Sequence, residues 1–148
     1  MAGRYGSITV SGCALTAATA KTVLQLRAVN VAFKLKEVHI GALGVLNTDS
    51  PILVEIVRQS TAGTMTNNAP VKGDDSCADS LNMTGQHTAT AGNEPTTGDI
   101  LRKYAVHPQQ PNTWMYGDEI ICGPADYIGL RVTAPQAVSV DATMVAEE

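Results

Sequence analysis

The protein has 148 residues, of which 44% are hydrophobic, 16% are charged and 4% are aromatic. This length suits one domain with a core of its own, and so few aromatic side chains mean that the core is built mainly from Val, Leu, Ile and Ala. Ten basic and fourteen acidic residues give a net charge of -4, and the basic residues are scattered along the chain. Scattered basic residues argue against nucleic acid and against a polybasic membrane contact. The low charge content favours a surface that is partly covered by a partner.

The N-terminal sequence MAGRYGSITV lacks the apolar core of a secretory signal, and no run of about 18 apolar residues is present to span a membrane. We therefore expect no signal peptide and no membrane partner. The cysteines Cys13, Cys77 and Cys122 are odd in number and form no CxxC pair, which predicts free thiols in a reducing compartment.

The three histidines are His39, His87 and His107. No two of them lie two or four residues apart, so the sequence offers no local metal-binding pair. No phosphate-binding GxxxxGK[ST] motif occurs either. We expect no cofactor and no metal.

Short segments in which apolar and polar residues alternate run through the chain, separated by turn residues. Residues 1–20 are predicted to form an N-terminal arm or a first edge strand, and residues 21–148 to form the domain. Alternation with a period of two is typical of half-buried antiparallel strands. We predict such strands at KTVLQLRA (21–28), AFKLKEVHIGAL (32–43), PILVEIVRQ (51–59), DILRKYAVHP (99–108), TWMYGDEIIC (113–122), YIGLRVTA (127–134) and AVSVDATMVA (137–146).

Two segments are predicted to depart from regular strand structure. In residues 32–43 the apolar positions change parity between Leu35 and Val38, which indicates a β-bulge or a strand that bends between two sheets. Residues 74–81 begin with acidic side chains suited to a helix N-terminus, so one helical turn is predicted there.

Many short strands without helices predict an all-β fold. Some connections are long and suit Greek-key crossovers better than tight hairpins. The predicted fold is therefore a single-domain β-sandwich with jelly-roll topology and about eight strands.

Aromatic and basic residues supply the candidates for an interface. Trp114 and Tyr116 share one face of a predicted strand, where they serve either as an interface anchor or as core packing. Arg4 and Tyr5, in the predicted N-terminal arm, are further candidates.

Two arginines lie in or at the end of apolar strands. Arg58 precedes Gln59, and Arg131 lies between Leu130 and Val132. Each is suited to a bidentate pair with a carboxylate of a neighbouring subunit, or else belongs to a solvated face or an intramolecular pair.

The stretch TGQHTATAGNEPTTGD, residues 84–99, contains His87, Glu94 and Asp99 and raises the question of catalysis. No GxSxG nucleophile elbow accompanies them. We therefore interpret the stretch as a structural crossover that ends in a turn, and we expect that the protein is not an enzyme.

A set of segments in a fixed order carries a resemblance over roughly residues 4–148. These segments are TAATAKTVLQLRA, VEIVRQSTAGTMT, QHTATAGNEPTTGDIL, VHPQ, the Trp114-x-Tyr116 pair and GLRVTAPQAVSVDA. In this order the chain resembles the capsid cement or head decoration proteins of tailed phages, of single jelly-roll type. The resemblance implies a role in the virion and carries no catalytic residues.

The resemblance thus leads us to expect a structural virion protein. It would bind the outer surface of a phage capsid, assemble in the host cytoplasm and reinforce contacts between major capsid protein subunits. Sister copies are expected as further partners, in a trimer first and a dimer second. The alternative is a carbohydrate- or receptor-binding jelly-roll module on a phage particle, against which the single Trp argues.

Overall fold

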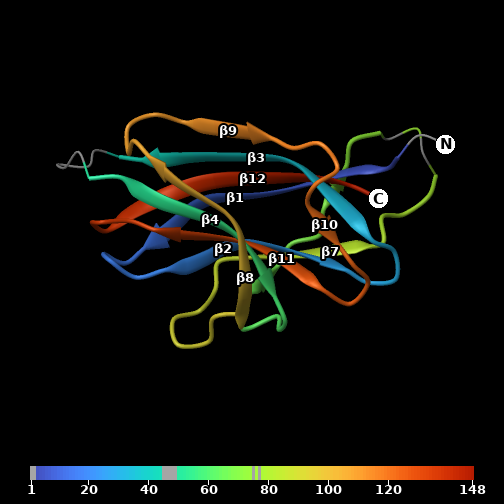
Figure 1. Ribbon diagram of the computed structural model, residues 1–148, viewed down its shortest axis with the longest axis horizontal. Helices are drawn as coiled ribbons and strands as arrows, with labels where there is room; N and C mark the ends of the chain where they lie inside the picture. Colours follow the sequence, from blue (N-terminus) through green and yellow to red (C-terminus); the bar gives the residue numbers. More distant parts are fainter. Residues whose placement is uncertain (1–2, 45–49, 75, 77) are drawn as a thin grey trace.

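The computed structural model describes residues 3–44, 50–74, 76 and 78–148. Within these residues the chain has no helix and forms twelve strands in two antiparallel sheets, which pack face to face as a β-sandwich (Figure 1). Eight of these strands have five residues or more, so the predicted all-β sandwich of about eight strands is confirmed. The helical turn predicted for residues 74–81 includes Asp75 and Cys77, which lie outside the described residues, and the rest of that segment contains no helix.

We call the two sheets A and B. Sheet A has the order β10-β3-β12-β1-β6, and β9 also pairs with β3. Its strands are β1 (Tyr5–Leu15), β3 (Phe33–Leu43), β6 (Val71–Lys72), β9 (Asn112–Met115), β10 (Ile121–Cys122) and β12 (Val138–Glu147). Sheet B has the order β5-β7-β2-β11-β4-β8. Its strands are β2 (Lys21–Ala28), β4 (Ile52–Gln59), β5 (Thr66–Asn67), β7 (Met83–His87), β8 (Thr97–Val106) and β11 (Tyr127–Thr133).

The core lies between the sheets and is made of the inward-facing side chains that the alternation selects. The largest fully buried apolar side chains are Ile8, Leu24, Leu26, Phe33, Leu35, Ile56, Ile128, Leu130 and Met144. Burial of each of these side chains stabilises the fold by about 1.5–3 kcal/mol. Phe33 is the single Phe of the chain, so the core is aliphatic, as the composition predicts.

The parity change in residues 32–43 is a β-bulge in β3, which is one of the two predicted alternatives. Val145 of β12 pairs with Glu37, but the next residue, Ala146, pairs with Leu35, so Lys36 is the extra residue. Leu35 and Val38 can therefore both face the core, and both are fully buried.

The N-terminal segment contains a strand of the sandwich. β1 pairs with β12 from Tyr5–Glu147 to Leu15–Val138, while β6 covers only Gly6 and Ser7 on its other side. Of the two predicted alternatives, arm and first edge strand, the structure therefore has the strand.

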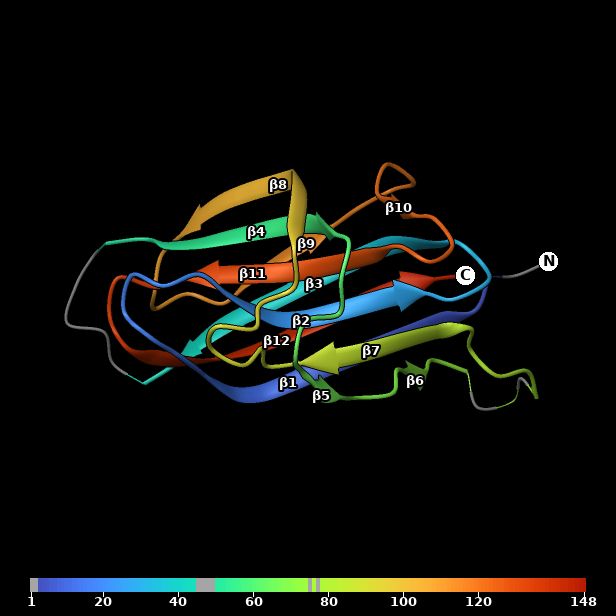
Figure 2. The same ribbon diagram turned by 90° about the horizontal axis from the view of Figure 1, so that it is seen from below.

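Two loops of the same chain, residues 60–65 and 88–96, cross the middle of the outer face of sheet B (Figure 2). The loops bind each other, because Thr64 donates its N–H to the carbonyl of Asn93 at 2.9 Å and Thr90 donates to that of Thr64 at 2.8 Å. They also bind the sheet, since Ala89 donates to the carbonyl of Thr22 at 3.0 Å. The middle of β2 is consequently buried on both faces.

Beneath the loops lies a buried polar seam, formed by Thr22, Gln25 and Gln59. Each of these side chains is at most 1% exposed. Gln25 Nε2 donates to Gln59 Oε1 at 2.8 Å, and Gln59 Nε2 donates to Thr22 Oγ1 at 3.0 Å. A second bond from Gln25 Nε2 reaches the carbonyl of Thr61 at 3.0 Å, so the seam fastens the first loop to the sheet. The amide of Gln59 can cross β11 only because residue 129 is glycine, where a Cβ would overlap the amide.

We expect Gly129→Ala to destabilise the protein by about 1–3 kcal/mol, because the added methyl displaces Gln59 from the seam. Urea denaturation followed by circular dichroism measures this change. Gly41→Ala is the matched control, since its nearest neighbour beyond the adjoining residues, Pro111, lies 3.8 Å from the new Cβ. Equal stability of the two variants would contradict the role given to Gly129.

Candidate interaction surfaces

The outer face of sheet A carries a row of small polar side chains across four strands. The row consists of Thr9, Thr143, His39 and Thr113, which face one another in register on β1, β12, β3 and β9. Thr9 Oγ1 and Thr143 Oγ1 are 3.0 Å apart, and His39 Nδ1 lies 3.0 Å from Thr113 Oγ1. We call this set the threonine row.

A second row runs beside it and ends in exposed apolar side chains. It consists of Val71, Ser7, Val145, Glu37 and Met115, in register from β6 to β9. Val71 is 67% exposed and Met115 is 75% exposed. Glu37 binds His39 of the threonine row through an Oε2–Nε2 contact of 3.0 Å, so the carboxylate in the middle of this face already has a partner.

Lysines and carboxylates gather at one end of sheet A. Lys36 Nζ lies 2.7 Å from Asp118 and 3.2 Å from Glu147, and Lys34 lies 3.1 Å from Asp118. The hydrogen bond to Asp118 raises the pKa of Lys36, and the hydrogen bonds to Lys36 and then Lys34 lower the pKa of Asp118. The two lysines and the two carboxylates neutralise one another, so this end of sheet A adds no net charge beside the two rows.

Trp114 and Tyr116 belong to an aromatic cluster within the chain. The ring of Trp114 stacks on that of Tyr104, with centroids 4.2 Å apart and planes inclined by 12°. The hydroxyls of Tyr104 and Tyr116 are 2.9 Å apart, and burial followed by this hydrogen bond raises the pKa of Tyr116. All three side chains pack against the core, so this geometry corresponds to the packing alternative. The cluster joins β8 of sheet B to β9 of sheet A.

Arg4 binds the last residue of the chain, and Tyr5 remains exposed. The guanidinium of Arg4 lies 3.2 Å from Glu148 Oε2 and donates to the carbonyl of Ser80 at 2.9 Å. Glu148 Oε1 also accepts the backbone N–H of Asn82 at 2.6 Å, so this carboxylate joins β1, β12 and the segment before β7. Tyr5 is 47% exposed and available for contact.

Arg58 and Arg131 both bind groups of their own chain. Arg131 forms an ion pair with Glu55 at 3.0 Å, and its Nε is buried with no hydrogen-bond partner among the described residues. Arg58 donates to the carbonyl of Ile121 at 3.4 Å, which links β4 of sheet B to β10 of sheet A. The six predicted interface residues are therefore spread over the molecule and do not form one site.

His87 and Glu94, two of the residues considered for catalysis, bind different partners. His87 Nδ1 lies 3.0 Å from Thr88 Oγ1, while Glu94 Oε2 accepts the backbone N–H of Thr22 at 3.0 Å. Glu94 thus holds the second loop on the edge of the polar seam. Within the described ranges no group of three or more His, Cys, Asp and Glu residues is placed to hold a metal ion.

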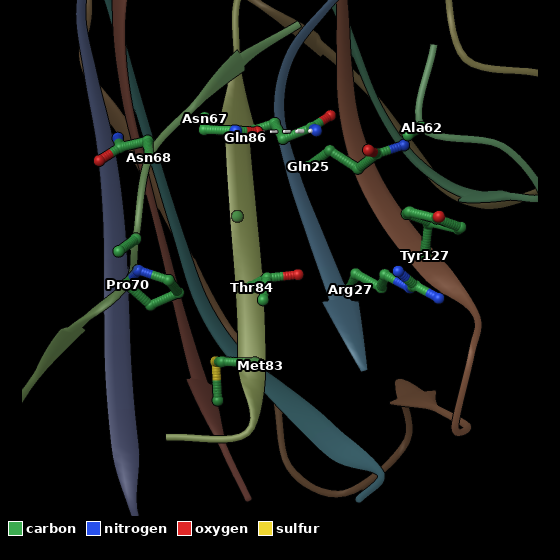
Figure 3. A pocket seen from close by; sticks show the side chains of 12 residues that line it. Gln25, Arg27, Ala62, Asn67, Asn68, Pro70, Met83, Thr84, Gln86 and Tyr127 are labelled. Carbon is green, nitrogen blue, oxygen red and sulfur yellow. Dashed lines mark hydrogen bonds between the residues drawn. The ribbon is translucent and has the colours of Figure 1, made fainter. Parts of the chain in front are cut away.

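A groove that the sequence did not reveal lies beside the loops on the outer face of sheet B (Figure 3). Its volume is about 350 Å³. Gln86 and Thr84 of β7 lie on its floor, with Arg27 and Tyr127 on one side and residues 67–70 on the other. We call it the amide groove. The groove forms where β2 pairs with β7, and no local sequence pattern predicts this pairing.

We expect Glu94→Ala to loosen the second loop, because the N–H of Thr22 loses a charged acceptor in a half-buried position. Such hydrogen bonds contribute about 1.5–3 kcal/mol. Hydrogen exchange measured by NMR should show faster exchange at the Thr22 amide and at the amides of the loop. Glu119→Ala, at an exposed position, is the control and should leave these rates unchanged. Unchanged exchange in Glu94→Ala would show that the contact does not hold the loop.

We expect Cys122 to resist alkylation in the folded protein. Cys122 and Cys13 are both buried free thiols, whereas Cys77 lies outside the described residues. Burial raises the pKa of Cys122 to about 11, so little reactive thiolate exists at neutral pH. Mass spectrometry after iodoacetamide treatment, read peptide by peptide, should show slow labelling of Cys122 at pH 8 and rapid labelling in urea.

The raised pKa of Cys122 also makes the stability of the folded protein depend on pH. An unfolded thiol has a pKa of about 8.5, so the folded state keeps the Cys122 proton to higher pH than the unfolded state does. The contribution of Cys122 is therefore complete below about pH 8.5 and is lost as the pH rises towards 11. Rapid labelling of folded Cys122 at pH 8 would contradict this account.

Comparison with known proteins identifies no relative. The chain matches no family model, no curated protein and no solved structure. In the part of the chain that the structure describes, no helix is long and apolar enough to cross a membrane. The function has to be argued from the geometry of the surfaces.

Proposed function

We propose that this protein is a structural virion protein that binds the outer surface of a phage capsid and reinforces contacts between major capsid protein subunits. One observation carries the proposal beyond the sequence resemblance. The middle of sheet B is covered by loops of its own chain, whereas the threonine row and the neighbouring row run across sheet A at its surface. The uncovered rows are suited to a second protein.

The chemistry of this face favours binding over catalysis. Hydroxyl groups can exchange water for hydrogen bonds with a partner, and they lose less free energy on burial than charged groups do. The carboxylate of Glu37 already has a hydrogen-bond partner in His39, which it can keep when a second protein covers this face. Val71 and Met115 supply exposed apolar area on either side. Copies on a symmetric lattice gain avidity, so each contact can be modest.

The strand order supports the jelly-roll interpretation. Without the short strands β5, β6 and β10 and the inserted β7, the chain has eight strands. These give the orders β1-β12-β3-β9 in sheet A and β2-β11-β4-β8 in sheet B. In chain order these are strands 1-8-3-6 and 2-7-4-5, the arrangement of two interleaved Greek keys.

Sister copies are the second proposed partner, in a closed trimer first and a dimer second. β8 is at the edge of sheet B and pairs only with β4 among the described strands. Ile100 on this strand is 48% exposed. An exposed edge with an apolar side chain suits contact between copies. Light scattering coupled to size-exclusion chromatography gives the number of copies.

The test is binding to capsids of the parent phage that were purified without this protein. We expect the protein to sediment with expanded capsids and to raise the temperature at which they break. Thr143→Lys, in the middle of the threonine row, should weaken binding at least about tenfold, because it buries an unpaired charge.

Thr90→Lys is the matched control, since Thr90 is exposed on the loop over sheet B. It should bind as the wild type does. Absence of sedimentation with capsids would overturn the proposed function. Equal binding by Thr143→Lys would instead reject sheet A as the contact face.

A further inference from the structure

We infer that the amide groove is a binding site for the end of a neutral saccharide. This inference is independent of the proposed capsid contact, because the groove lies on sheet B and the threonine row lies on sheet A. The volume of about 350 Å³ falls at the lower end of the range for small-molecule pockets. Such a volume suits one or two sugar rings rather than a long chain.

The floor of the groove contains two amide carbonyls that lack donors. Gln25 and Gln86 pair directly across β2 and β7, so their side chains share one face of the sheet. Both N–H groups of Gln25 are used in the polar seam, while its Oε1 accepts no hydrogen bond from the described residues. Gln86 Oε1 is buried without a partner, although Nε2 of the same side chain donates to Asn67 at 3.1 Å.

An unpartnered buried carbonyl destabilises a protein by about 1–3 kcal/mol. A ligand that displaces the exposed side chain of Asn67 breaks its bond to Gln86 Nε2 and leaves the terminal amide of Gln86 free to turn its Oε1 towards the groove. A ligand with donor groups then satisfies both carbonyls. The empty groove thus has two carbonyl acceptors without donors at its floor, and both are almost wholly buried before a ligand arrives.

The charges around the groove select the class of ligand. Arg27 is the only ionised side chain among the described lining residues, and it faces Thr84 across the same strand pair. A cationic ligand would be repelled by this guanidinium, which no lining carboxylate offsets. An ionised carboxylate without hydroxyl groups has no donor for the two carbonyls. A neutral ligand with several O–H groups satisfies both conditions.

The remaining lining groups complete a site for hydroxyls. Thr84 is exposed, and its hydroxyl both donates and accepts. The guanidinium of Arg27 lies 5.4 Å from the centre of the Tyr127 ring, and this stacking holds both side chains at the rim. Tyr127 adds a ring and a phenolic hydroxyl beside the groove. Sugars offer alternating C–H and O–H groups that match such a mixture.

The far wall of the amide groove is attached to the body of the protein by hydrogen bonds. Residues 67–70 form the far wall, and Asn68 ties this segment to β1 by donating its side-chain N–H to the carbonyl of Thr9 at 2.8 Å. The backbone N–H of Asn68 donates to Gly85 at 2.9 Å. Asn68 thus ties the wall to β1 and to β7 before any ligand arrives, which lowers the entropy lost on binding.

The test is saturation-transfer difference NMR with three sets of probes at millimolar concentration. The neutral set contains methyl glucoside, methyl galactoside, methyl rhamnoside and methyl N-acetylglucosaminide. The anionic probe is methyl glucuronide, and the peptide probe is N-acetylalanine amide. We expect a neutral saccharide to give the strongest signal, and a glycan array then extends the best probe to longer chains.

Variants locate the signal. Gln86→Met removes the unpartnered carbonyl at similar volume, and Thr84→Val removes an exposed hydroxyl and cannot disturb the core. Each should weaken binding about tenfold, which corresponds to the loss of one or two hydrogen bonds. Gln109→Met, in an exposed turn, is the matched control and should bind normally.

Three results would overturn the inference. They are no response from any saccharide, wild-type binding by both Gln86→Met and Thr84→Val, and a stronger response from the glucuronide or the peptide probe. None of these results bears on capsid binding, which the Thr143→Lys variant tests separately.

Discussion

The arrangement of this molecule depends on one hydrogen-bonded side chain, Gln59, which lies across Gly129 and joins Gln25 to Thr22. Amides buried in an apolar sheet are unfavourable unless their donors and acceptors are matched. Here the N–H groups of Gln25 and both ends of the Gln59 amide are matched by each other, by Thr22 and by the carbonyl of Thr61, which belongs to a loop. The carbonyl of Gln25 is left without a donor among the described residues. The loops over sheet B are therefore part of the folded body, and their attachment has a chemical basis in the sheet beneath them.

That attachment divides the protein into two unlike faces. The loops cover the middle of sheet B, and the amide groove lies beside them between β2, β7 and residues 67–70. The rows of sheet A, from Val71 to Met115, stay uncovered. One sandwich thus presents a flat surface suited to another protein and a concave surface suited to a small ligand. The two proposed activities use opposite sheets, so both can operate on the same particle.

The alternation of apolar and polar residues was sufficient to predict the sandwich and a bulge or bend between Leu35 and Val38, because both depend on which neighbouring residues share a face. The pairing with β12 decides for the bulge and places it at Lys36. It was insufficient for single side chains. Trp114 stacks on Tyr104, which is ten residues away and belongs to the other sheet. Arg131 pairs with Glu55, 76 residues earlier in the chain. Such contacts depend on strand order, and periodicity says which face a residue occupies without naming the strand beside it.

The stretch from Thr84 to Asp99 shows both what the sequence could predict and what it could not. Its small polar residues indicated a connection rather than an active site, and its His87 and Glu94 indeed bind different partners. Its start, however, forms the floor of the amide groove, and its middle covers the polar seam. Composition and alternation determine a short-range property, the choice of strand and of inward face. The seam, the groove and the uncovered face arise from pairing between strands distant in sequence, which only the folded chain brings into contact.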